Sequence, residues 1–402
     1  MNILIVTQVY HPDTSSVSQH MTDLAENLAL RSHSVEVISS RYGYDSDNFY
    51  PKKTQNKGVL INRVLHSNYD KKYFFFRALN FLSFNFSLLI NLMIRRRSVD
   101  IVIGTTVPPF SALIGVIFAK IQKVPFYFWV MDLQPELSIS SGLLKEKSIS
   151  AYFFRFLGDL IIRNSSKLIS LDRFMTEHLK QRGALSSNIH EIPVWPVSKD
   201  FYDGNRSSNP FRVKNKYGDK IVIMYSGNHA YVHPLKTLLE AAKTLKSDPR
   251  FLFSFIGGGV RKKEVTEYKL KYQLSNIVQH EYQPRNSFHI SIAAADLQVV
   301  ILGEGQVGFT HPNKIYGSMF LGKPILYIGP ELSHISEILS NLKKNILVRH
   351  GDVDDLVSYL INFAELSNDE ISLIGKKNLE HAKIFFSPDR LLNKMIKIIE
   401  KP

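Results

Sequence analysis

The sequence contains no cysteine, which excludes disulfide bonds and metal sites built from thiolates and is typical of a cytoplasmic protein. No charged leader precedes the strand-like stretch at residues 2–7, so we expect no signal peptide. The chain also lacks the glycine turn of dinucleotide-binding proteins, a P-loop, a His-Glu-x-x-His pair and a Gly-x-Ser-x-Gly elbow. Because no group of residues has metal-ligand spacing either, we expect no metal and no cofactor.

The composition indicates a folded protein with two domains. The 402 residues exceed the usual size of one domain, and a hydrophobic fraction of 44% can fill two cores. The formal net charge is +14, with lysines and arginines spread over both halves. This spread argues against a nucleic-acid arm and favours a surface that meets anionic lipid or anionic substrates.

The most apolar stretch is "KKYFFFRALNFLSFNFSLLINLMIRRR", at residues 71–97. An arginine and three asparagines interrupt it, whereas a membrane span needs about 20 mostly apolar residues. Two interpretations stay open. The segment is either a helix buried in the first domain or a helix in the membrane interface, with Lys71, Lys72 and Arg95–Arg97 toward lipid phosphates. The second interpretation predicts a peripheral protein at the inner face of the plasma membrane.

Strand and helix patterns alternate almost throughout, which predicts α/β domains with parallel sheets covered by helices. A Pro- and Gly-bearing stretch near residues 189–210 separates two such series. We therefore predict a Rossmann-like domain at residues 1–198 and a second one at 199–385, with the C-terminal helix at 386–402 as a candidate to pack back on the first. Ligands of doubly wound sheets bind beyond the carboxyl ends of the strands, here in a cleft between the domains.

In the second domain, four polar or glycine-bearing loops follow predicted strands. They are "YSGNHAYVHP", "FIGGGVRKK", "EYQPR" and "EGQVGFTHPNK". The last of these places His311, Asn313 and Lys314 at the start of a predicted helix, just after Gly308. Glycines let a ligand approach the backbone, and a lysine at a helix start favours an anion. Each loop alone is better explained as a turn, but the four together predict a diphosphate site at one sheet edge.

These motifs resemble the glycosyltransferases of family four, which are retaining enzymes of the GT-B fold. "YHPDTSSVSQHMTDLAENLALRSHSVEVISS" is similar to their amino-terminal signature, and "VMDLQPELSISSGLL" to their DLWPE segment. "YSGNHAYVHPLKTLLEAA" is similar to the opening of their donor domain, and "VGFTHPNKIYGSMFLGKPILYIGP" to their nucleotide-sugar loop. The resemblance covers nearly the whole chain and is strongest to bacterial transferases of the colanic-acid or O-antigen kind.

The resemblance implies that the second domain binds a nucleotide-sugar donor and the first a saccharide acceptor, expected to be linked to polyprenyl diphosphate at a membrane. The implied catalytic residues are Asp132, Glu136, His311 and Lys314. The implied donor-binding residues are Ser15, Ser16, Gly227, Asn228, His229, Gly257, Gly258, Gly259, Gln283, Pro284, Arg285, Glu304, Gly308, Pro312, Asn313 and Tyr316. The implied acceptor-side residues are Asp13, Thr14, Thr105 and Thr106.

The sequence departs from the family pattern at several positions. Widespread members carry two glutamates eight positions apart, the second of which grips the ribose; this chain has Phe309 and Gly317 there. The ribose anchor must then come from elsewhere, with Glu304 and Lys314 as candidates. The phosphate-gripping arginine and lysine that usually follow the first strand of the second domain are also missing, and Asn228 and His229 stand near the former.

Three functions therefore remain open. The first is a retaining glycosyltransferase of surface-polysaccharide assembly, in which the departing diphosphate takes the proton of the acceptor hydroxyl and Asp132 orients the acceptor. The second is a nucleotide-sugar epimerase of the same fold. The third, motivated by the missing glutamates, is a non-catalytic subunit that binds nucleotide sugar. The sequence leaves the donor sugar, its base, the acceptor and the oligomeric state open.

Overall fold

The computed structural model describes residues 1–44, 48–69, 74–95, 97–196, 202, 204–284 and 287–401. The chain forms two compact units. Unit 1 comprises Met1–Pro193, Gly308–His311 and Asp389–Pro402, and unit 2 comprises Val194–Val307 and Pro312–Pro388. The boundary predicted between residues 198 and 199 lies outside the described residues, and the division falls between Pro193 and Val194.

Unit 1 is built on an eight-stranded sheet with the order β3-β4-β2-β1-β5-β6-β7-β8. Its strands are β1 (Asn2–Val6), β2 (Ser34–Ser40), β3 (Lys53–Asn56), β4 (Val59–Val64), β5 (Ile101–Thr105), β6 (Phe126–Trp129), β7 (Lys167–Ser170) and β8 (Ile189–Glu191). All pairs are parallel except β3 with β4. The sequence pattern predicted the five central strands, whereas the β3–β4 hairpin and the short β8 lack its buried apolar runs.

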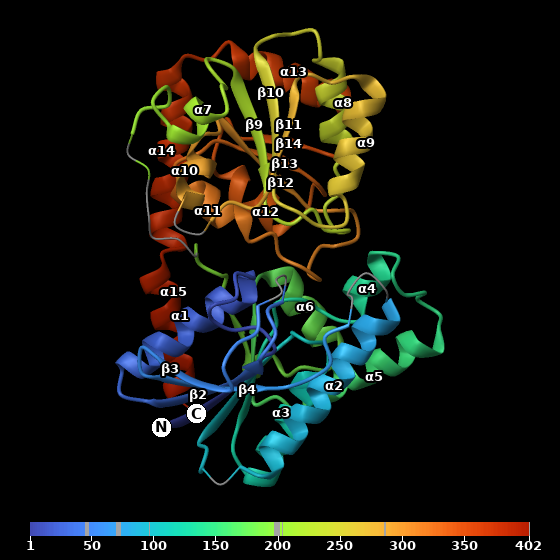
Figure 1. Cartoon of the computed structure of the whole chain (residues 1–402), viewed down its shortest axis with the longest axis vertical. Coiled ribbons are helices and arrows are strands. Elements are labelled where there is room, and N and C mark those ends of the chain that lie inside the picture. Colours follow the sequence, from blue (N-terminus) through green and yellow to red (C-terminus); the bar gives the residue numbers. More distant parts are fainter. Residues whose placement is uncertain are drawn as a thin grey trace. The chain divides into compact units, whose positions relative to one another are not determined.

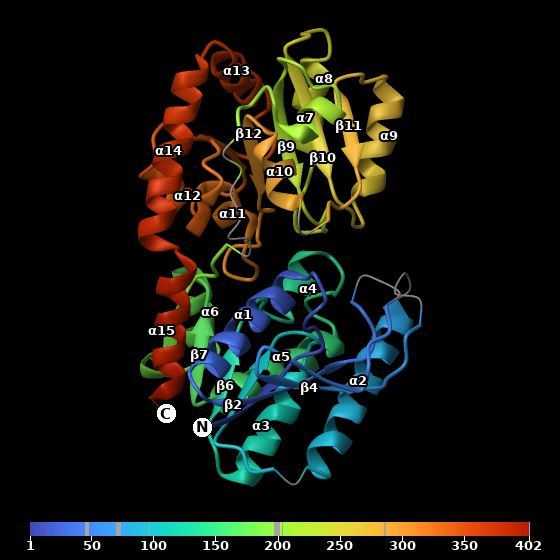
Figure 2. The same cartoon turned by 60° about the vertical axis from the view of Figure 1, so that its left-hand side comes forward.

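The helices of unit 1 are α1 (Ser16–Leu30), α2 (Phe74–Met93), α3 (Ser111–Gln122), α4 (Glu136–Ser140), α5 (Ile149–Arg163), α6 (Arg173–Gln181) and α15 (Pro388–Glu400), with a 3-10 turn η1 (Ser186–Asn188). Helix α15 buries an apolar stripe that includes Leu391, Met395 and Ile399. It lies beside α1, where the two termini also come close (Figures 1 and 2). The ring of His33 contacts the Glu400 carboxylate at 3.1 Å.

Helix α2 explains why both interpretations of residues 71–97 were open. One face, with Phe84, Leu88 and Leu92, is buried, whereas the opposite face is apolar and exposed. Arg95 is not directed at solvent, because its guanidinium pairs with Glu36 at 2.6 Å and its side chain is 9% exposed. Lys71, Lys72 and Arg96 lie outside the described residues. Among the helices that the structure describes, none has the length and apolarity to cross a membrane.

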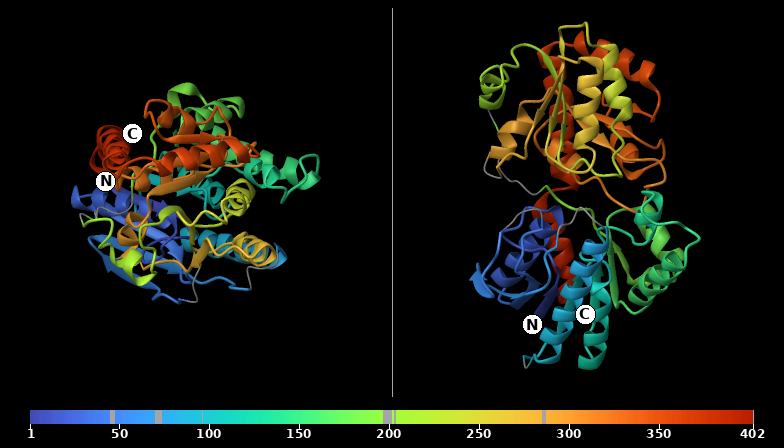
Figure 3. Two further views of the ribbon diagram at one scale, coloured as in Figure 1. Left: turned by 90° about the horizontal axis from the view of Figure 1, so that it is seen from above. Right: turned by 45° about the vertical axis from the view of Figure 1, so that its right-hand side comes forward.

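Unit 2 is built on a six-stranded parallel sheet with the order β11-β10-β9-β12-β13-β14. Its strands are β9 (Ile221–Ser226), β10 (Phe251–Ile256), β11 (Ile277–His280), β12 (Leu297–Ile301), β13 (Ile325–Ile328) and β14 (Ile346–Val348). Its helices are α7 (Pro210–Lys214), α8 (Lys236–Thr244), α9 (Lys262–Tyr272), α10 (Phe288–Ala293), α11 (Lys314–Phe320), α12 (His334–Ser340), α13 (Val353–Ala364) and α14 (Asn368–Phe385). They lie on both faces of the sheet (Figure 3), which is why the strands are apolar throughout.

The strand order locates the ligand edge of each unit. In unit 2 the chain runs outward from β9 to β11 on one side and from β12 to β14 on the other. In unit 1 the same reversal occurs between β1 and β5. At such switch points the connections leave in opposite directions, so a crevice opens beyond the carboxyl ends of the two strands. The loops after β9 and β12, and those after β1 and β5, are therefore the places where each unit can hold a ligand.

Candidate active site

Two glycine-bearing loops meet beside the switch point of unit 2. The loop after β9 carries Gly227 and His229, and the loop after β10 carries Gly257 and Gly258. The backbone N–H of His229 donates to the carbonyl of Gly258 at 2.7 Å. Gly257 has a φ of +123°, and a Cβ there would collide with the carbonyl oxygen of Gly227. Only glycine therefore allows the two loops to approach this closely.

Lys314, the first residue of α11, reaches the same place. Its Nζ atom lies 3.7 Å from the centroid of the Tyr225 ring, near the end of β9. A Cβ on Gly227 would be 3.6 Å from this Nζ atom, so the glycine leaves the ammonium uncovered on that side. Although part of the side chain is exposed, Nζ itself is buried and has no hydrogen-bond partner among the described residues. Burial lowers the pKa of Lys314 from 10.5 to about 7.

Two histidines, His229 and His233, lie near this lysine. The rings of His229 and His233 meet the Tyr225 ring edge-on, at 5.1 and 6.4 Å between centroids. The Nδ1–H of His229 donates to the carbonyl of Gly258 at 3.1 Å, which leaves its buried Nε2 without a partner in the described chain. Burial, aided by the charge of Lys314, lowers the pKa of His229 to about 4 and that of His233 well below its ordinary value. Both rings are therefore neutral near pH 7.

The electrostatics of this site call for an anion. An unpaired ammonium in a buried place is costly, and within the described part of the chain the face of the Tyr225 ring is what compensates it. A diphosphate would supply the missing charge, and Lys314 and the glycine loops are arranged to receive it. The structure thus brings Lys314, Gly227 and His229 together in unit 2, and their roles toward a ligand stay a prediction.

The remaining described donor-side candidates of unit 2 lie on several loops and on α11. Gln283 and Pro284 lie on the exposed loop after β11, and Arg285 lies outside the described residues. The carboxylate of Glu304 is exposed. Tyr316 is buried with its ring 4.8 Å from that of Phe386, so it contributes to the core. The other candidates of this group are Asn228, whose carbonyl accepts from Tyr225, Gly259 after β10, and Pro312 and Asn313 directly before α11.

The segment Gly308–His311 belongs to unit 1, where it lies against the start of α6 and the loop after β6. Gly308 has a φ of +77°, and a Cβ there would come within 3.0 Å of the carbonyl oxygen of Phe174. The carbonyl of Phe309 accepts from the backbone N–H of Leu133 at 2.8 Å. Thr310 donates to Asp132 at 2.7 Å. Gly308 therefore serves the packing of this segment on α6, in addition to any role toward a donor.

His311 and Asp132 form the polar centre of unit 1. The Nδ1 atom of His311 lies 2.9 Å from a carboxylate oxygen of Asp172, the N-terminal cap of α6. Because a carboxylate only accepts, Nδ1 carries the hydrogen and the tautomer is fixed. Burial raises the pKa of Asp132 above its ordinary value, and the hydrogen bond from Thr310 opposes this shift. The two groups can therefore bind and orient a hydroxyl group.

Glu136 is occupied by arginines. Its carboxylate accepts from Arg155 at 3.2 Å and from Arg182 at 2.9 Å. Arg182 also donates to Asp159 and to two backbone carbonyls, those of Gln134 and Arg155. This network fastens α4 to α5 and α6. It gives Glu136 a positioning role, and a direct catalytic role for this residue stays a prediction.

The predicted site residues after β1 make hydrogen bonds to their own loop and to neighbouring backbone. The carboxylate of Asp13 accepts from the backbone N–H groups of Ser15 and Tyr44, and the hydroxyl of Ser15 caps α1. Ser16 begins α1, and the carbonyl of Thr14 accepts from a side-chain amide one turn later. These contacts hold the loop in shape, and a ligand role for any of these side chains stays a prediction.

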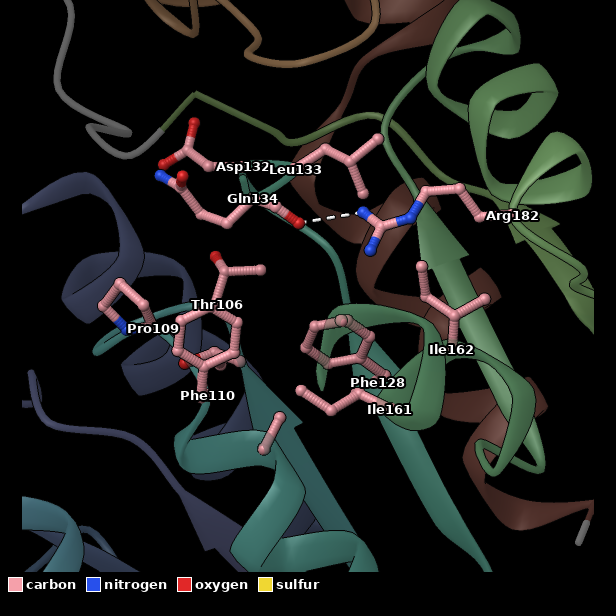
Figure 4. A pocket seen from close by; sticks show the side chains of 13 residues that line it. Thr106, Pro109, Phe110, Phe128, Asp132, Leu133, Gln134, Ile161, Ile162 and Arg182 are labelled. Atoms are coloured by element: carbon pink, nitrogen blue, oxygen red, sulfur yellow. Dashed lines mark hydrogen bonds between the residues drawn. The ribbon is translucent and has the colours of Figure 1, made fainter. Parts of the chain in front are cut away.

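A pocket opens beside Asp132, within unit 1 (Figure 4). It has about 370 Å³ of empty space, including open solvent at its mouth. Its lining residues are Thr105, Thr106, Pro109, Phe110, Ala112, Phe128, Asp132, Leu133, Gln134, Gly158, Ile161, Ile162 and Arg182. Thr105 is bonded to Thr7 behind the wall, whereas the buried Thr106 hydroxyl has no partner among the described residues. The acceptor-side candidate Thr106 and the catalytic candidate Asp132 thus line one cavity.

Comparison with known proteins identifies the chain. Residues 16–195 match the model described as "Glycosyl transferase 4-like domain", and residues 207–377 match "Glycosyl transferases group 1". Together the two matches cover more than four fifths of the chain. The protein belongs to glycosyltransferase family four.

Relatives and solved structures of glycosyltransferases agree with this. The chain is 28% identical to the probable glycosyltransferase WbjE of Pseudomonas aeruginosa over 71% of this chain and 67% of the relative. It is 21% identical to the putative colanic acid biosynthesis glycosyl transferase WcaI of Escherichia coli K12, over 80% and 82%. Anabaena HepE in complex with UDP and glucose shares 13% identity at a TM-score of 0.74, and WaaG, involved in lipopolysaccharide biosynthesis, 14% at 0.72, each over 100% of both chains. The fold of this glycosyltransferase is GT-B.

Some residues of this glycosyltransferase site were not predicted. Tyr225 forms the platform under Lys314, and Asp172 orients His311. Asp172 follows β7 directly, so the rule that polar residues after parallel strands gather at one edge would have found it. Tyr225 lies inside a buried strand, and no sequence signal separates it from an ordinary core residue.

Proposed function

We propose that this protein is a retaining glycosyltransferase that moves a sugar from a nucleoside diphosphate to a saccharide acceptor. The observation that carries the proposal is the buried ammonium of Lys314 beside the glycine loops of unit 2, which has no hydrogen-bond partner among the residues that the structure describes. Unit 2 would bind the donor and unit 1 the acceptor. The family membership supports the transfer reaction, and the geometry of the lysine site supports a diphosphate leaving group.

Lys314 would act most strongly as the glycosidic bond breaks. The diphosphate gains negative charge while the sugar takes on positive charge, so a cation fixed in a buried place stabilises the transition state more than the bound donor. The Nζ atom carries its proton in only about half of the free molecules at pH 7, because its pKa is about 7. Binding of the diphosphate would raise this pKa and complete the charge of the site.

Unit 1 would bind the acceptor and orient its reacting hydroxyl group. Asp132 has a raised pKa and His311 a fixed tautomer, so both are suited to orient a hydroxyl group. With retention, the departing phosphate would accept the hydroxyl proton as the new glycosidic bond forms on the same face of the sugar. Such a reaction needs no separate protein base. We propose that it needs no metal ion either, because Lys314 and backbone N–H groups would neutralise the diphosphate.

The chemistry of the acceptor is proposed from the relatives. WcaI is named for colanic acid biosynthesis and WaaG for lipopolysaccharide biosynthesis. A lipid-linked saccharide in the assembly of a bacterial surface polysaccharide is the corresponding acceptor for this chain. Such an acceptor would require the enzyme to work at a membrane surface.

One face of unit 1 supports contact with a membrane. Helix α3 packs between α2 and α5, and all three expose apolar side chains. Examples are Met93 on α2, Ile121 on α3, and Ile149 and Phe153 on α5; Met93 is 76% and Ile149 88% exposed. An apolar helical face of this kind, on a chain with net charge +14, suits an anionic bilayer.

Flotation tests the membrane contact. The protein should float with vesicles that contain anionic phospholipid at low salt, and replacing Met93 and Phe153 by serine should weaken this binding at least tenfold. Leu373→Ser, an exposed apolar residue of α14 in unit 2, is the matched control and should float like the unaltered protein. Absence of flotation at low salt would remove the membrane contact and leave the transfer reaction in place.

A pair of lysine variants tests the transfer reaction. Lys314→Ala should lower transfer from nucleotide sugars by a hundredfold or more, as loss of a leaving-group cation does, while the fold measured by circular dichroism stays intact. Lys263→Ala, with a side chain that is 84% exposed, is the control and should leave transfer unchanged. Turnover of Lys314→Ala within a few-fold of the unaltered enzyme would refute the phosphate role.

The epimerase and the non-catalytic subunit are separated by the same assay. Incubation with a panel of nucleotide sugars but no acceptor should leave the donor sugars unchanged. Conversion of a donor to its epimer would instead support the epimerase. Nucleotide binding without transfer to any saccharide acceptor would support the non-catalytic subunit, which the replacement of the two family glutamates by Phe309 and Gly317 suggests.

A further inference from the structure

The cavity of unit 1 has an apolar floor and a polar rim. Phe110, Phe128, Ile161 and Ile162 line the floor, and Thr106, Asp132 and Gln134 lie toward the mouth (Figure 4). Its roughly 370 Å³ of empty space includes open solvent at the mouth, so the enclosed part is small. A space of this kind suits one small substituent of a sugar and not a polyprenyl chain.

The rim offers hydrogen bonds that the described chain does not use. The Thr106 hydroxyl is buried without a partner. The side-chain oxygen of Gln134, which also lines the cavity, accepts from Ser138 at 2.7 Å, and this contact fixes the amide. Arg182 is different, because Asp159, Glu136 and two carbonyls hold its guanidinium. The polar groups that the cavity can offer to a ligand are therefore the Thr106 hydroxyl, the Gln134 amide and the Asp132 carboxylate.

The floor is held in place at a conformational cost. Phe110 has φ +67° and ψ −1°, in the left-handed region that bulky residues avoid. Its ring stacks on Phe154 of α5, with centroids 5.1 Å apart. Backbone strain of this kind persists where the surroundings enforce it, and it gathers at ligand sites. Here it presents an aromatic ring to the cavity beside Thr106.

We propose that this cavity seats the acetamido group of an acceptor sugar. The methyl group would lie on Phe110, Phe128 and Ile162, and the amide would pair with Thr106 and Gln134. A plain C-methyl group would fill the floor but leave the Thr106 hydroxyl unpaired, and a hydroxyl group would place polar atoms on an apolar floor. The inference rests on the proposed function, since it assigns the substrate class of the acceptor in unit 1.

Ligand-observed NMR on the full chain tests the assignment. Saturation transfer is measured for methyl glycosides with and without a 2-acetamido group, in the gluco and galacto configurations, and for methyl fucoside, which carries a plain methyl group. Each measurement is made with a nucleoside diphosphate present. The acetamido glycosides should bind about tenfold more tightly than their 2-hydroxyl counterparts, with the acetyl methyl receiving the strongest saturation.

A conservative variant identifies the cavity as the site. Thr106→Val keeps the volume and removes the hydroxyl, and it should weaken acetamido-glycoside binding about fivefold. Thr244→Val, at an exposed position of α8, is the control and should bind like the unaltered protein. Equal binding of both glycoside classes, better binding of methyl fucoside, or indifference to Thr106→Val would overturn the proposal.

The outcome is separable from that of the proposed function. Nucleoside diphosphate binding is measured on the same samples and depends on Lys314 in unit 2. If the nucleotide binds and the acetamido preference is absent, the cavity assignment is wrong and the transferase proposal stands. If the acetamido preference is present and no nucleotide binds, the assignment holds and the donor proposal is wrong.

Discussion

Replacing Lys314 by methionine should stabilise the free protein, because the lysine sits in a place that suits its substrate better than the protein alone. Methionine keeps the volume and unbranched shape of the side chain and removes the charge. Burial lowers the pKa of Lys314 from 10.5 to about 7. Removing the charge should therefore raise the free energy of unfolding, by an amount that depends on pH.

The magnitude follows from the two pKa values. Between pH 7 and 10.5 the unfolded chain binds more protons at this lysine than the folded protein, so stability rises with pH across that window. Below pH 7 both states are protonated and the full penalty applies. A shift from 10.5 to about 7 corresponds to at most about 5 kcal/mol at pH 6, falling to about 2 kcal/mol at pH 9.

Urea unfolding at both pH values measures this difference. The unfolding free energy of Lys314→Met should exceed that of the unaltered protein at pH 6, and the gap should shrink by more than half at pH 9. Lys263→Met, at an exposed lysine, should show no gap at either pH. A Lys314→Met protein less stable than the unaltered one at pH 6, or a gap independent of pH, would refute the buried-cation account.

Three further predictions concern two residues of unit 1 and the proposed independence of transfer from metal ions. Glu136→Gln should lower the unfolding free energy by roughly 2–3 kcal/mol, because it weakens the pairs with Arg155 and Arg182; loss of transfer at unchanged stability would instead show a direct catalytic role. Asp172→Asn keeps the α6 cap, since asparagine caps equally well, but releases His311, so transfer should fall roughly a hundredfold at unchanged nucleotide affinity. Transfer should be insensitive to EDTA, and activity that EDTA removes and Mg²⁺ restores would contradict the metal-free proposal.

The fold could be predicted because buried parallel strands carry a strong signal. Runs such as residues 221–226 and 297–301 are apolar at every position, and they alternate with amphipathic helices. Strands β3 and β8 were missed because they are short edge strands with few apolar residues, and β4 was missed because polar residues interrupt its apolar pattern. The sequence could not decide between the two interpretations of helix α2. A helix that is apolar on both faces has the same sequence pattern whether its second face meets protein or lipid.

The site could be predicted where it depends on chain topology. Loops after parallel strands converge, so the sequence brought Gly227, His229 and Lys314 to one edge. It could not give the pairing of side chains. That Glu136 is held by two arginines, or that Gly308 packs on α6, depends on contacts between elements far apart in the chain. The unpaired state of the Thr106 hydroxyl is likewise visible only in three dimensions.

Proton uptake on nucleotide binding tests the central claim most directly. At pH 8 a lysine with a pKa of about 7 is protonated in about one tenth of free molecules. Titration calorimetry with UDP, GDP and ADP in buffers of different ionisation enthalpy counts the protons bound. If the bound diphosphate keeps Lys314 protonated, we expect uptake of up to about 0.9 proton per bound nucleotide at pH 8, and none from this residue in Lys314→Met. Tight binding by the unaltered protein with no proton uptake would show that Lys314 does not receive the diphosphate.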